Sequence, residues 1–393
     1  MVRVASAFFR KLYSLNANSE SDNPQIKRFK KAELAKIRNG FGSTFEQISS
    51  DMPMWFNDYI EQPEYYPKFA LVANLYAHHS LPIHHKVESL GKTLAVKNNV
   101  DKLFFSEKRF KSIINAHNEE IIVNLRQAIS IAKNHEVPID YQSLLEDLLD
   151  WEDNSTVQFR WARDYWKSGL NIEKWEQEIA NEMKQETEED KSKSQLNEKI
   201  LAEITQARIF AKYLHSLREN QEERHKPINY QAILANLRRG LGKPLGDIDM
   251  LPYLAPFLPE AKSKFEETRL FKEIYPAYFL VASLFTLHPH SLENNDYNIG
   301  RILGCLARPK NNNDGKQTLQ KRFTALLDAD SHDIGNHLRQ LIALAKIANM
   351  PINYRQLLLD LIDWQKYGKS VQRQWAKEYF SELERKGNEN APT

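Results

Sequence analysis

The sequence predicts an all-α protein made of two homologous multi-helix bundles in tandem, joined by a charged, partly helical linker. Three observations lead to this prediction. Apolar residues recur at helical spacing through the 393 residues, no sustained alternation typical of strands is present, and several segments occur twice in the same order.

The helical spacing begins at the N-terminus and is clearest near residue 140. MVRVASAFFRKLYSL has basic and apolar residues at helical spacing and lacks the uninterrupted apolar core of a secretory signal, so it predicts a first helix. An amphipathic helix is predicted from Tyr141, Leu144, Leu145, Leu148 and Leu149. Asp140 after Pro138, and Asn353 after Pro351 in the second copy, are start signals for this helix. A further apolar stripe is formed by Leu125, Ala128, Ile129 and Ala132, and it recurs at Leu338, Leu341, Ile342 and Ala345.

The repeat covers whole domains. PIDYQSLLEDLLDW (138–151) matches PINYRQLLLDLIDW (351–364), and VQFRWARDYW (157–166) matches VQRQWAKEYF (371–380). From Pro138 to Trp166, 14 of 29 aligned positions are identical. Upstream, residues 109–133 match 322–346, and IRNGFG (37–42) matches LRRGLG (237–242). We therefore predict a first domain at 1–168, a linker at 169–200, a second domain at 201–381 and a polar tail at 382–393.

The VQ motif supplies apolar residues every four positions. These are Val157, Trp161 and Tyr165 in the first copy and Val371, Trp375 and Tyr379 in the second. Large apolar residues on one helix face are typical of core packing, so we expect them to anchor a terminal helix in the core.

Composition excludes several classes of protein. No apolar run of about 20 residues is present, so a membrane span is not expected. Cys305 is the single cysteine, which excludes an intrachain disulfide and a multi-cysteine metal site and favours a cytoplasmic location. The net charge is only +2, with +1 in residues 1–168 and +6 in residues 201–381. Nucleic-acid binding would therefore require basic side chains gathered on one face.

The sequence contains no convincing active site. The histidines of AHHSLPIHHK (His78, His79, His84 and His85) are matched in the second copy only by His288, which argues against a metal site. DADSHD (328–333) could be the carboxylate cluster of a nuclease, but the first copy has NAHNEE there, and acidic residues at a helix junction are ordinarily caps. Phosphate-loop, nucleophile-elbow and zinc-protease motifs are absent. We expect no catalysis, no cofactor and no small-molecule substrate.

Basic residues recur at matching positions of the two copies. Arg126 and Lys133 lie seven residues apart beside an apolar stripe, and Arg339 and Lys346 repeat this placement. The other matching placements are Lys92 and Arg301 after a glycine, Arg109 and Arg322 at a helix start, Arg38 and Arg238-Arg239 before Gly-x-Gly, and Arg163 and Lys377 on the polar face of the VQ motif. For any one residue, a solvated face with scattered ion pairs is the simpler interpretation. Repetition in two diverged copies favours a groove that tracks phosphates.

Six blocks in this order resemble a known family. They are ALVANLYA/FLVASLFTLHP, SLG[KR], RF..LL.AD, LR....LAK, P[IL].[YW]..LL.DL..W and VQ..WA..[YF], and identical or related segments stand in this order in both copies. Together they resemble the small subunit of the type I-E CRISPR Cascade complex, the CasB family. The resemblance implies an all-helical, non-catalytic protein that contacts the backbone subunits and the large subunit. It also implies a basic face that helps to hold the guide RNA–target DNA heteroduplex and the displaced strand.

The resemblance places the nucleic-acid face on particular residues. It falls on Arg38, Lys92, Arg109 and Arg126 in the first copy and on Arg238, Arg239, Arg301, Arg322 and Arg339 in the second. Family members normally carry one copy per chain, so this chain would supply both small subunits. Asn39 stands where the second copy has Arg239, so one contact is missing from the first copy.

Two alternatives remain open at this stage. The chain could be a purely structural scaffold that binds only protein neighbours, or a metal-dependent nuclease acting through Asp328 or Asp330. The partners expected from the first hypothesis are guide RNA, either strand of target DNA and the other Cascade subunits, with no membrane.

Overall fold

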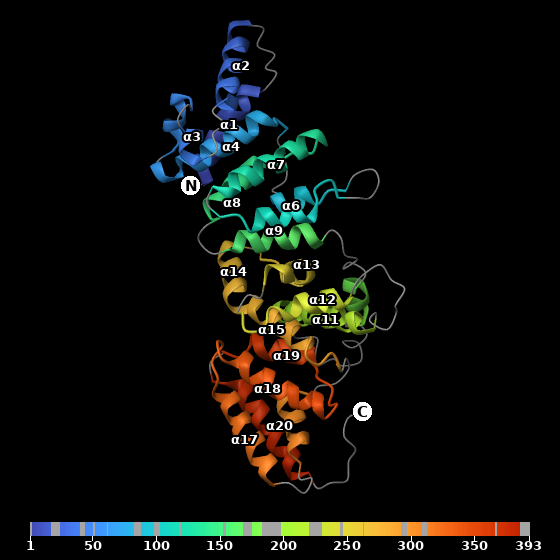
Figure 1. Cartoon of the computed structure of the whole chain (residues 1–393). Coiled ribbons are helices and arrows are strands. Elements are labelled where there is room, and N and C mark those ends of the chain that lie inside the picture. Colours follow the sequence, from blue (N-terminus) through green and yellow to red (C-terminus); the bar gives the residue numbers. More distant parts are fainter. Residues whose placement is uncertain are drawn as a thin grey trace. The chain divides into compact units, whose positions relative to one another are not determined.

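The computed structural model confirms the all-α, two-domain prediction. It describes residues 2–16, 24–39, 44–49, 52–60, 62–81, 88–97, 103–117, 119–151, 155–167, 175–182, 198–219, 230–243, 247–261, 263–291, 297–308, 313–365 and 368–385. Within these ranges no β-strand forms, and the extended backbone makes only isolated bridges, Lys97 with Leu103 and Ser291 with Ile352. The chain divides into two compact units, Met1–Gly169 and Leu170–Thr393 (Figure 1).

The first unit is a bundle of helices joined by short turns. Its helices are α1 (Val2–Asn16), α2 (Pro24–Asn39), α3 (Phe45–Ser49), α4 (Tyr66–His78), α5 (Leu90–Leu94), α6 (Glu107–Ile114), α7 (Glu120–Asn134), α8 (Tyr141–Leu149) and α9 (Thr156–Lys167). Two 3₁₀ turns, Met54–Tyr59 and Pro63–Tyr65, lead into α4.

The second unit repeats this order. Its helices are α11 (Glu198–Glu219), α12 (Tyr230–Arg238), α13 (Leu251–Leu254), α14 (Lys264–Arg269), α15 (Tyr275–Phe285), α16 (Ile299–Ala307), α17 (Asn313–Asp328), α18 (Ile334–Ile347), α19 (Tyr354–Ile362) and α20 (Ser370–Glu384). Two 3₁₀ turns, Ile248–Met250 and Ala255–Phe257, flank α13, and a π-helical turn at Leu270–Ile274 joins α14 to α15. None of the helices in the described part of the chain is long and apolar enough to cross a bilayer.

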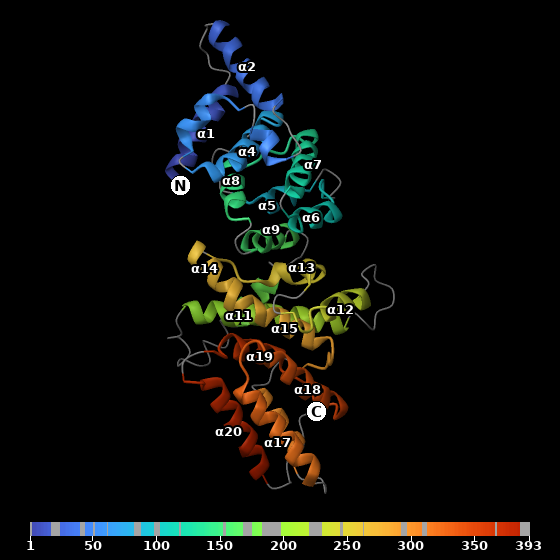
Figure 2. The ribbon, with the colours of Figure 1, turned by 60° about the vertical axis from the view of Figure 1, so that its left-hand side comes forward.

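Each unit is organised around one apolar helix (Figures 1 and 2). In α4 every residue from Phe69 to Ala77 is buried, and α15 is buried along nearly its whole length. The first packs against α2, α7 and α8, and the second against the matching helices α12, α18 and α19. A helix that is apolar all round belongs in a core, so these two helices fix where their neighbours end.

The sequence-predicted helix starts and core anchors are confirmed. Asp140 accepts a hydrogen bond from the Ser143 amide at 2.9 Å, and Asn353 accepts one from the Gln356 amide at the same distance. All six apolar residues of the VQ motif are buried, as are the two predicted stripes of α7 and α18. The motif is therefore structural in both copies.

Part of the predicted linker belongs to the second unit. Residues 175–182 are helical, the Trp175 ring lies 6.1 Å from that of Phe257, and Ile179 is buried. Lys212 Nζ lies 2.6 Å from the Glu178 carboxylate. This stretch therefore packs as core, whereas the charged run QETEEDKSKS lies outside the described residues.

The buried tryptophan of each VQ motif donates to a buried aspartate, but the two aspartates differ in their other partners. Trp161 Nε1 donates to Asp147 at 2.5 Å, and Asp147 also accepts from the Arg160 guanidinium. Trp375 Nε1 donates to Asp360 at 2.6 Å, where the second partner is the Gln356 amide at 2.8 Å. With no cation in that place, burial raises the pKa of Asp360 from 3.8 to about 6.

We expect Asp360→Asn to stabilise the second unit at pH 7 by up to about 3 kcal/mol. The folded-state pKa lies above the unfolded-state value, so the stability that this carboxyl contributes is complete below pH 3.8 and is lost as the pH rises through about 6. The gain should therefore vanish when thermal unfolding is followed below pH 4.

Asp147→Asn is the matched control. It removes the charge that the half-buried Arg160 guanidinium contacts, so this substitution should lower the stability of the first unit at neutral pH. Destabilisation by both substitutions at pH 7 would contradict the explanation.

Candidate nucleic-acid interface

In the first unit, α2, α4 and α7 end at one place. Asn74 in α4 donates through Nδ2 to the Ile37 carbonyl at 2.7 Å, which fixes the last turn of α2 against α4. Arg38 then reaches the end of α4, where its Nε donates to the Ala77 carbonyl at 3.0 Å. The carbonyls at both helix ends are thereby satisfied by side chains.

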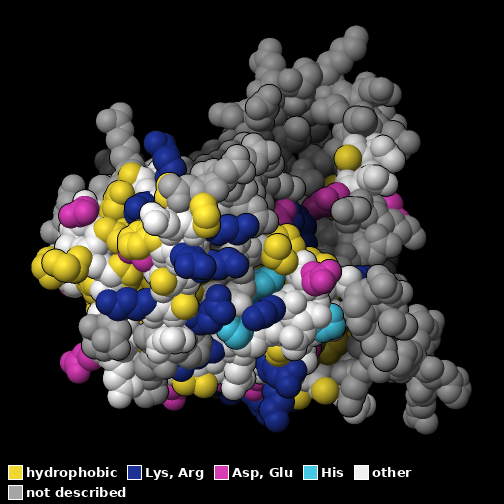
Figure 3. Space-filling view, turned by 90° about the horizontal axis from the view of Figure 1, so that it is seen from above, with side chains coloured by type: hydrophobic (Ala, Val, Ile, Leu, Met, Phe, Trp, Pro, Cys, Tyr) yellow, Lys and Arg dark blue, Asp and Glu magenta, His cyan; other side chains and the backbone are white. Residues whose placement is uncertain are grey.

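Lys133, in the last turn of α7, reaches the same place. Burial lowers the pKa of the His78 imidazole, and the positive charges of Lys133 and Arg38 lower it further. Its Nε2 is 3.2 Å from Ser130 Oγ on α7. We call Arg38, His78 and Lys133 the first helix-end cluster. Figure 3 looks down on this unit and shows lysines and arginines gathered with histidines on one face.

The second unit repeats the arrangement with different side chains. Ser283 Oγ donates to the Leu237 carbonyl at 3.0 Å, and Arg238 donates through Nη2 to the Thr286 carbonyl at 3.0 Å. Burial lowers the pKa of His288, and the charges of Lys346 and Arg218 lower it as well. We call Arg218, Arg238, His288 and Lys346 the second helix-end cluster.

Both clusters are placed where local electrostatics favours cations. The carboxyl end of a helix carries about half a negative charge, and several helices of each unit end here. This field holds the basic side chains in place, although Arg38, Lys133, Arg238 and Lys346 remain exposed. Positive side chains held on a surface at helix ends suit an anionic ligand with spaced charges.

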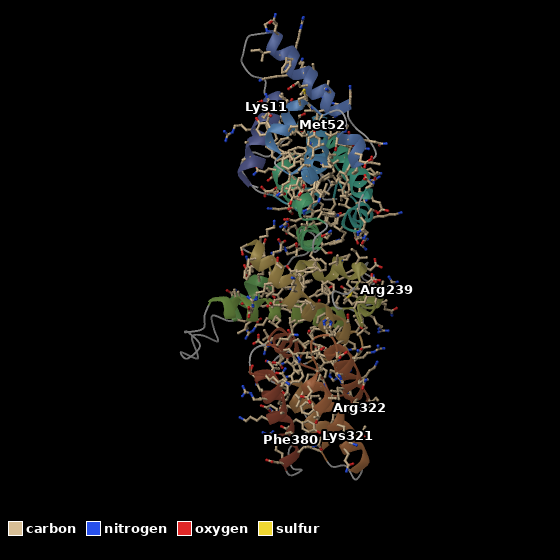
Figure 4. All side chains as sticks on the ribbon, turned by 90° about the vertical axis from the view of Figure 1, so that its left-hand side faces the viewer. Lys11, Met52, Arg239, Lys321, Arg322 and Phe380 are labelled. Carbon is tan, nitrogen blue, oxygen red and sulfur yellow. The ribbon has the colours of Figure 1, made fainter. Side chains whose placement is uncertain are left out.

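The thirteen predicted contact residues fall into three groups. Exposed cations that form no ion pair within the described ranges are Arg109, Lys133, Arg322, Arg339, Lys346 and Lys377. Exposed cations with a polar partner are Arg38 and Arg238, bound to carbonyls, Lys92, 3.2 Å from Glu88, and Arg239, 2.7 Å from Asp249. The less accessible ones are Arg126, Arg163 and Arg301. Arg239 and Arg322 lie at the surface of the second unit in Figure 4.

The placement of Arg163 on a polar face was wrong. This residue is 7% exposed, and its Nη2 and Nε lie 2.9 and 3.1 Å from Asp164 Oδ1. Arg301 is also held inside its unit, because its Nε lies 3.0 Å from the buried carboxylate of Glu382 and its guanidinium lies over the Tyr297 ring. Arg308 and Arg385 bind the same carboxylate. Because Arg301 lies on α16 and Glu382 on α20, their ion pair connects these two helices.

Residues considered for metal binding or catalysis have structural contacts. His79 donates through Nε2 to the Val137 carbonyl at 2.7 Å, and His288 donates to the Met350 carbonyl at the same distance. Asp330 accepts from the amides of His332 and Asp333, which lowers its pKa. His84 and His85 lie outside the described residues. Across the described ranges, no three His, Cys, Asp or Glu side chains gather as metal ligands would.

Two groups of basic residues were missed by the sequence prediction. Arg218 enters the second cluster from α11, which no repeated motif marked. Lys27, Arg28, Lys31 and Lys36 are exposed on α2, where six of sixteen residues are Lys or Arg, and this local density was the available signal.

Comparisons with known proteins agree with the duplication. The family model described as CRISPR-associated protein Cse2 matches residues 33–166 and again residues 233–380. A CRISPR-associated protein Cse2 of Thermus thermophilus is 35% identical over 152 residues, which cover 38% of this chain and 80% of that protein.

Solved structures are also similar to part of the chain. A crystal structure of a Cse2-family protein from Thermus thermophilus is 29% identical, with 44% of this chain and 97% of that chain covered and a TM-score of 0.34. A chain from a structure described as a CRISPR RNA-guided surveillance complex is 23% identical, with 44% and 95% covered and a TM-score of 0.34.

Proposed function

Because the chain belongs to the CRISPR-associated Cse2 family and carries the family segment twice, we propose that it replaces two small subunits of a Cascade-type effector complex. The predicted domains, residues 1–168 and 201–381, would each stand for one small subunit. The chain would act in the cytoplasm without catalysis. It would contact the backbone subunits, the large subunit, the guide RNA–target DNA heteroduplex and the displaced strand.

The observation that carries this proposal is the doubled helix-end cluster. The two clusters use different side chains to fix the helix ends, Asn74 in one and Ser283 in the other, and yet both present an arginine and a lysine at matching positions. Because the supporting residues have changed while the exposed cations are present in both, their positive charge is the shared feature. A phosphate backbone is the ligand that such sequence-independent charge suits.

The energetics of target opening are consistent with a protein that makes only a few phosphate contacts. In RNA-guided recognition, base pairing reads the sequence, and opening the target exchanges one duplex for another of similar stability. A few phosphate contacts are therefore enough to shift the balance towards the open state. A protein with this role needs neither a deep pocket nor a large net charge.

The experiment that tests this function removes one exposed lysine from each cluster. We expect Lys133→Gln combined with Lys346→Gln to weaken target-DNA binding by the assembled complex about tenfold or more at 0.1 M salt. The slope of log K against log salt should become shallower by about 1.4 to 1.8, because two phosphate contacts are lost. Binding is measured over several salt concentrations.

The control removes the same charge elsewhere. Lys272→Gln with Arg373→Gln changes two exposed cations of the second unit that lie outside both clusters. This control should leave the slope near that of the unmodified complex. If the cluster variant binds target like the unmodified complex while the complex cannot assemble without the chain, the protein is a structural scaffold instead.

A further inference from the structure

Helix α2 carries far more positive charge than its packing requires. Six of its sixteen residues are Lys or Arg, and Glu33 is its single acidic residue. Only Leu34 and Ile37, in its second half, are buried. Residues 24–29 are all exposed, and the first half of the helix extends away from the rest of the first unit (Figures 1 and 2).

Three of these cations follow one line along the helix. Lys27, Lys31 and Arg38 are spaced i, i+4 and i+11, which places them within about 40° of one another around the helix axis. At about 1.5 Å per residue the line is roughly 16 Å long. Lys27 and Lys31 are exposed, and neither forms an ion pair within the described ranges.

The line ends in the first helix-end cluster. Arg38, its last member, donates to the end of α4, and its charge acts on His78 together with that of Lys133. The line of α2 cations therefore leads from the exposed first half of the helix towards this cluster, to which α7 contributes Lys133.

The second copy lacks four of these cations at the aligned positions of the sequence. Aligned through IRNGFG and LRRGLG, the positions of Lys27, Arg28, Lys31 and Lys36 hold Pro227, Ile228, Gln231 and Asn236. The buried positions are kept, since Leu34 and Ile37 correspond to the buried Leu234 and Leu237. The same packing therefore forms without the cations, so packing does not explain why α2 has them.

We propose that the first half of α2, whose cations the second copy lacks at the aligned positions, is an arm that binds the phosphate backbone of a single nucleic-acid strand and delivers it to the first helix-end cluster. The identity of the strand rests on the proposed function, whereas the arm itself rests on the charge line. A line one side chain wide can follow one backbone but not the two backbones that border a duplex groove. The two copies then hold nucleic acid unequally although their helix-end clusters match.

Two other partners suit this surface less well. An interfacial membrane helix needs an apolar face along its length, but Leu34 and Ile37 are used for packing, which leaves Ile26 and Phe29 as the exposed large apolar residues of α2. A protein partner would cover these two side chains rather than the lysine line. Phe29, which is 61% exposed, lies on a different side of the helix from Lys27 and Lys31, so the two partners can be tested separately.

The test uses the purified full-length chain with labelled single-stranded DNA, single-stranded RNA of the same sequence, and duplex DNA. The double substitution Lys27→Gln with Lys31→Gln removes two charges from the line and keeps good helix formers. For single strands each lost phosphate contact reduces the salt slope by about 0.7, so the slope should fall by about 1.4 and the affinity at 0.1 M salt by about 25-fold. The DNA and RNA arms show which kind of strand the arm holds, and duplex DNA should be affected less.

Lys272→Gln with Arg373→Gln is the control of equal charge, and it should change neither slope nor affinity appreciably. An equal loss in both variants would show a general charge effect and overturn the proposal, as would unchanged single-strand binding in the α2 variant. A third variant, Phe29→Ala, tests the protein partner. If it impairs assembly of the complex while the lysine variant binds strands normally, α2 docks on a protein and the proposal fails.

Failure of the arm can be separated from failure of the proposed function. If the Lys133 and Lys346 variant weakens target binding by the complex while the α2 variant does not, the function stands and the arm does not. If neither variant weakens target binding, the proposed function and the proposed arm are both wrong.

Discussion

Replacing Gly300 by alanine is expected to destabilise the second unit by about 3 kcal/mol or more. A Cβ built at this position would lie 2.1 Å from the carbonyl oxygen of Trp375, so the backbones of α16 and α20 are in direct contact there. Backbone atoms cannot turn aside as a side-chain end can. The two helices would have to separate, which loosens the packing around the buried Trp375.

The measurement is the denaturant-induced unfolding of the full chain, with Gly335→Ala as control. Gly335 also lies within a helix, but its nearest contact for a Cβ is the Leu280 Cδ1 atom at 3.2 Å, the end of a flexible side chain. Because alanine is the better helix former, that change should be close to neutral. The first copy offers a replicate, since a Cβ at Gly91 would lie 2.2 Å from the Trp161 carbonyl. A Gly300→Ala protein as stable as the control would contradict the contact.

Cutting the chain between the two units is expected to lower the apparent affinity of the second docking step by about 100- to 10,000-fold. While the halves are joined, docking of one holds the other near its site at a high effective concentration. A protease recognition sequence placed within residues 168–174 would separate the first unit from the helix at 175–182, which packs in the second unit. Occupancy of each half in the complex is then measured by mass before and after cleavage, at several dilutions.

A cut within residues 183–197 is the matched control for that experiment. It also breaks the chain, but Trp175, Ile179 and Glu178 remain in contact with the second unit and hold the pieces together. We expect this cut to reduce occupancy less than the first. Equal retention of both halves after the first cut would show that the covalent connection adds nothing to assembly.

The sequence predicted the helices best where one face is apolar and the other polar. The stripes of α7 and α18 were found because their apolar residues return every three or four positions and each helix buries one face. The extent of the linker was harder to predict from the sequence. Trp175 and Ile179 have helical spacing, but spacing does not reveal which unit will cover them.

The candidate site was predicted in part, and Arg163 shows the limit. In α9 the residues opposite the VQ stripe, Thr156, Phe159 and Arg163, are buried as well. The matching residues of α20, Ser370, Arg373 and Lys377, are exposed. Two related helices with the same motif therefore differ in how many faces are covered, and that depends on neighbours far away in the sequence.

By itself, the sequence determined that the protein is all-helical, that its domain is duplicated and that it resembles CasB, because periodicity and repetition are local properties of the chain. Only the tertiary structure decided which of the repeated cations gather. Arg38 and Lys133 are 95 positions apart and meet because α2 and α7 end against α4. Arg301 is drawn instead to the buried Glu382. The interaction between charged groups depends on their distance in space, and the packing of the helices determines that distance.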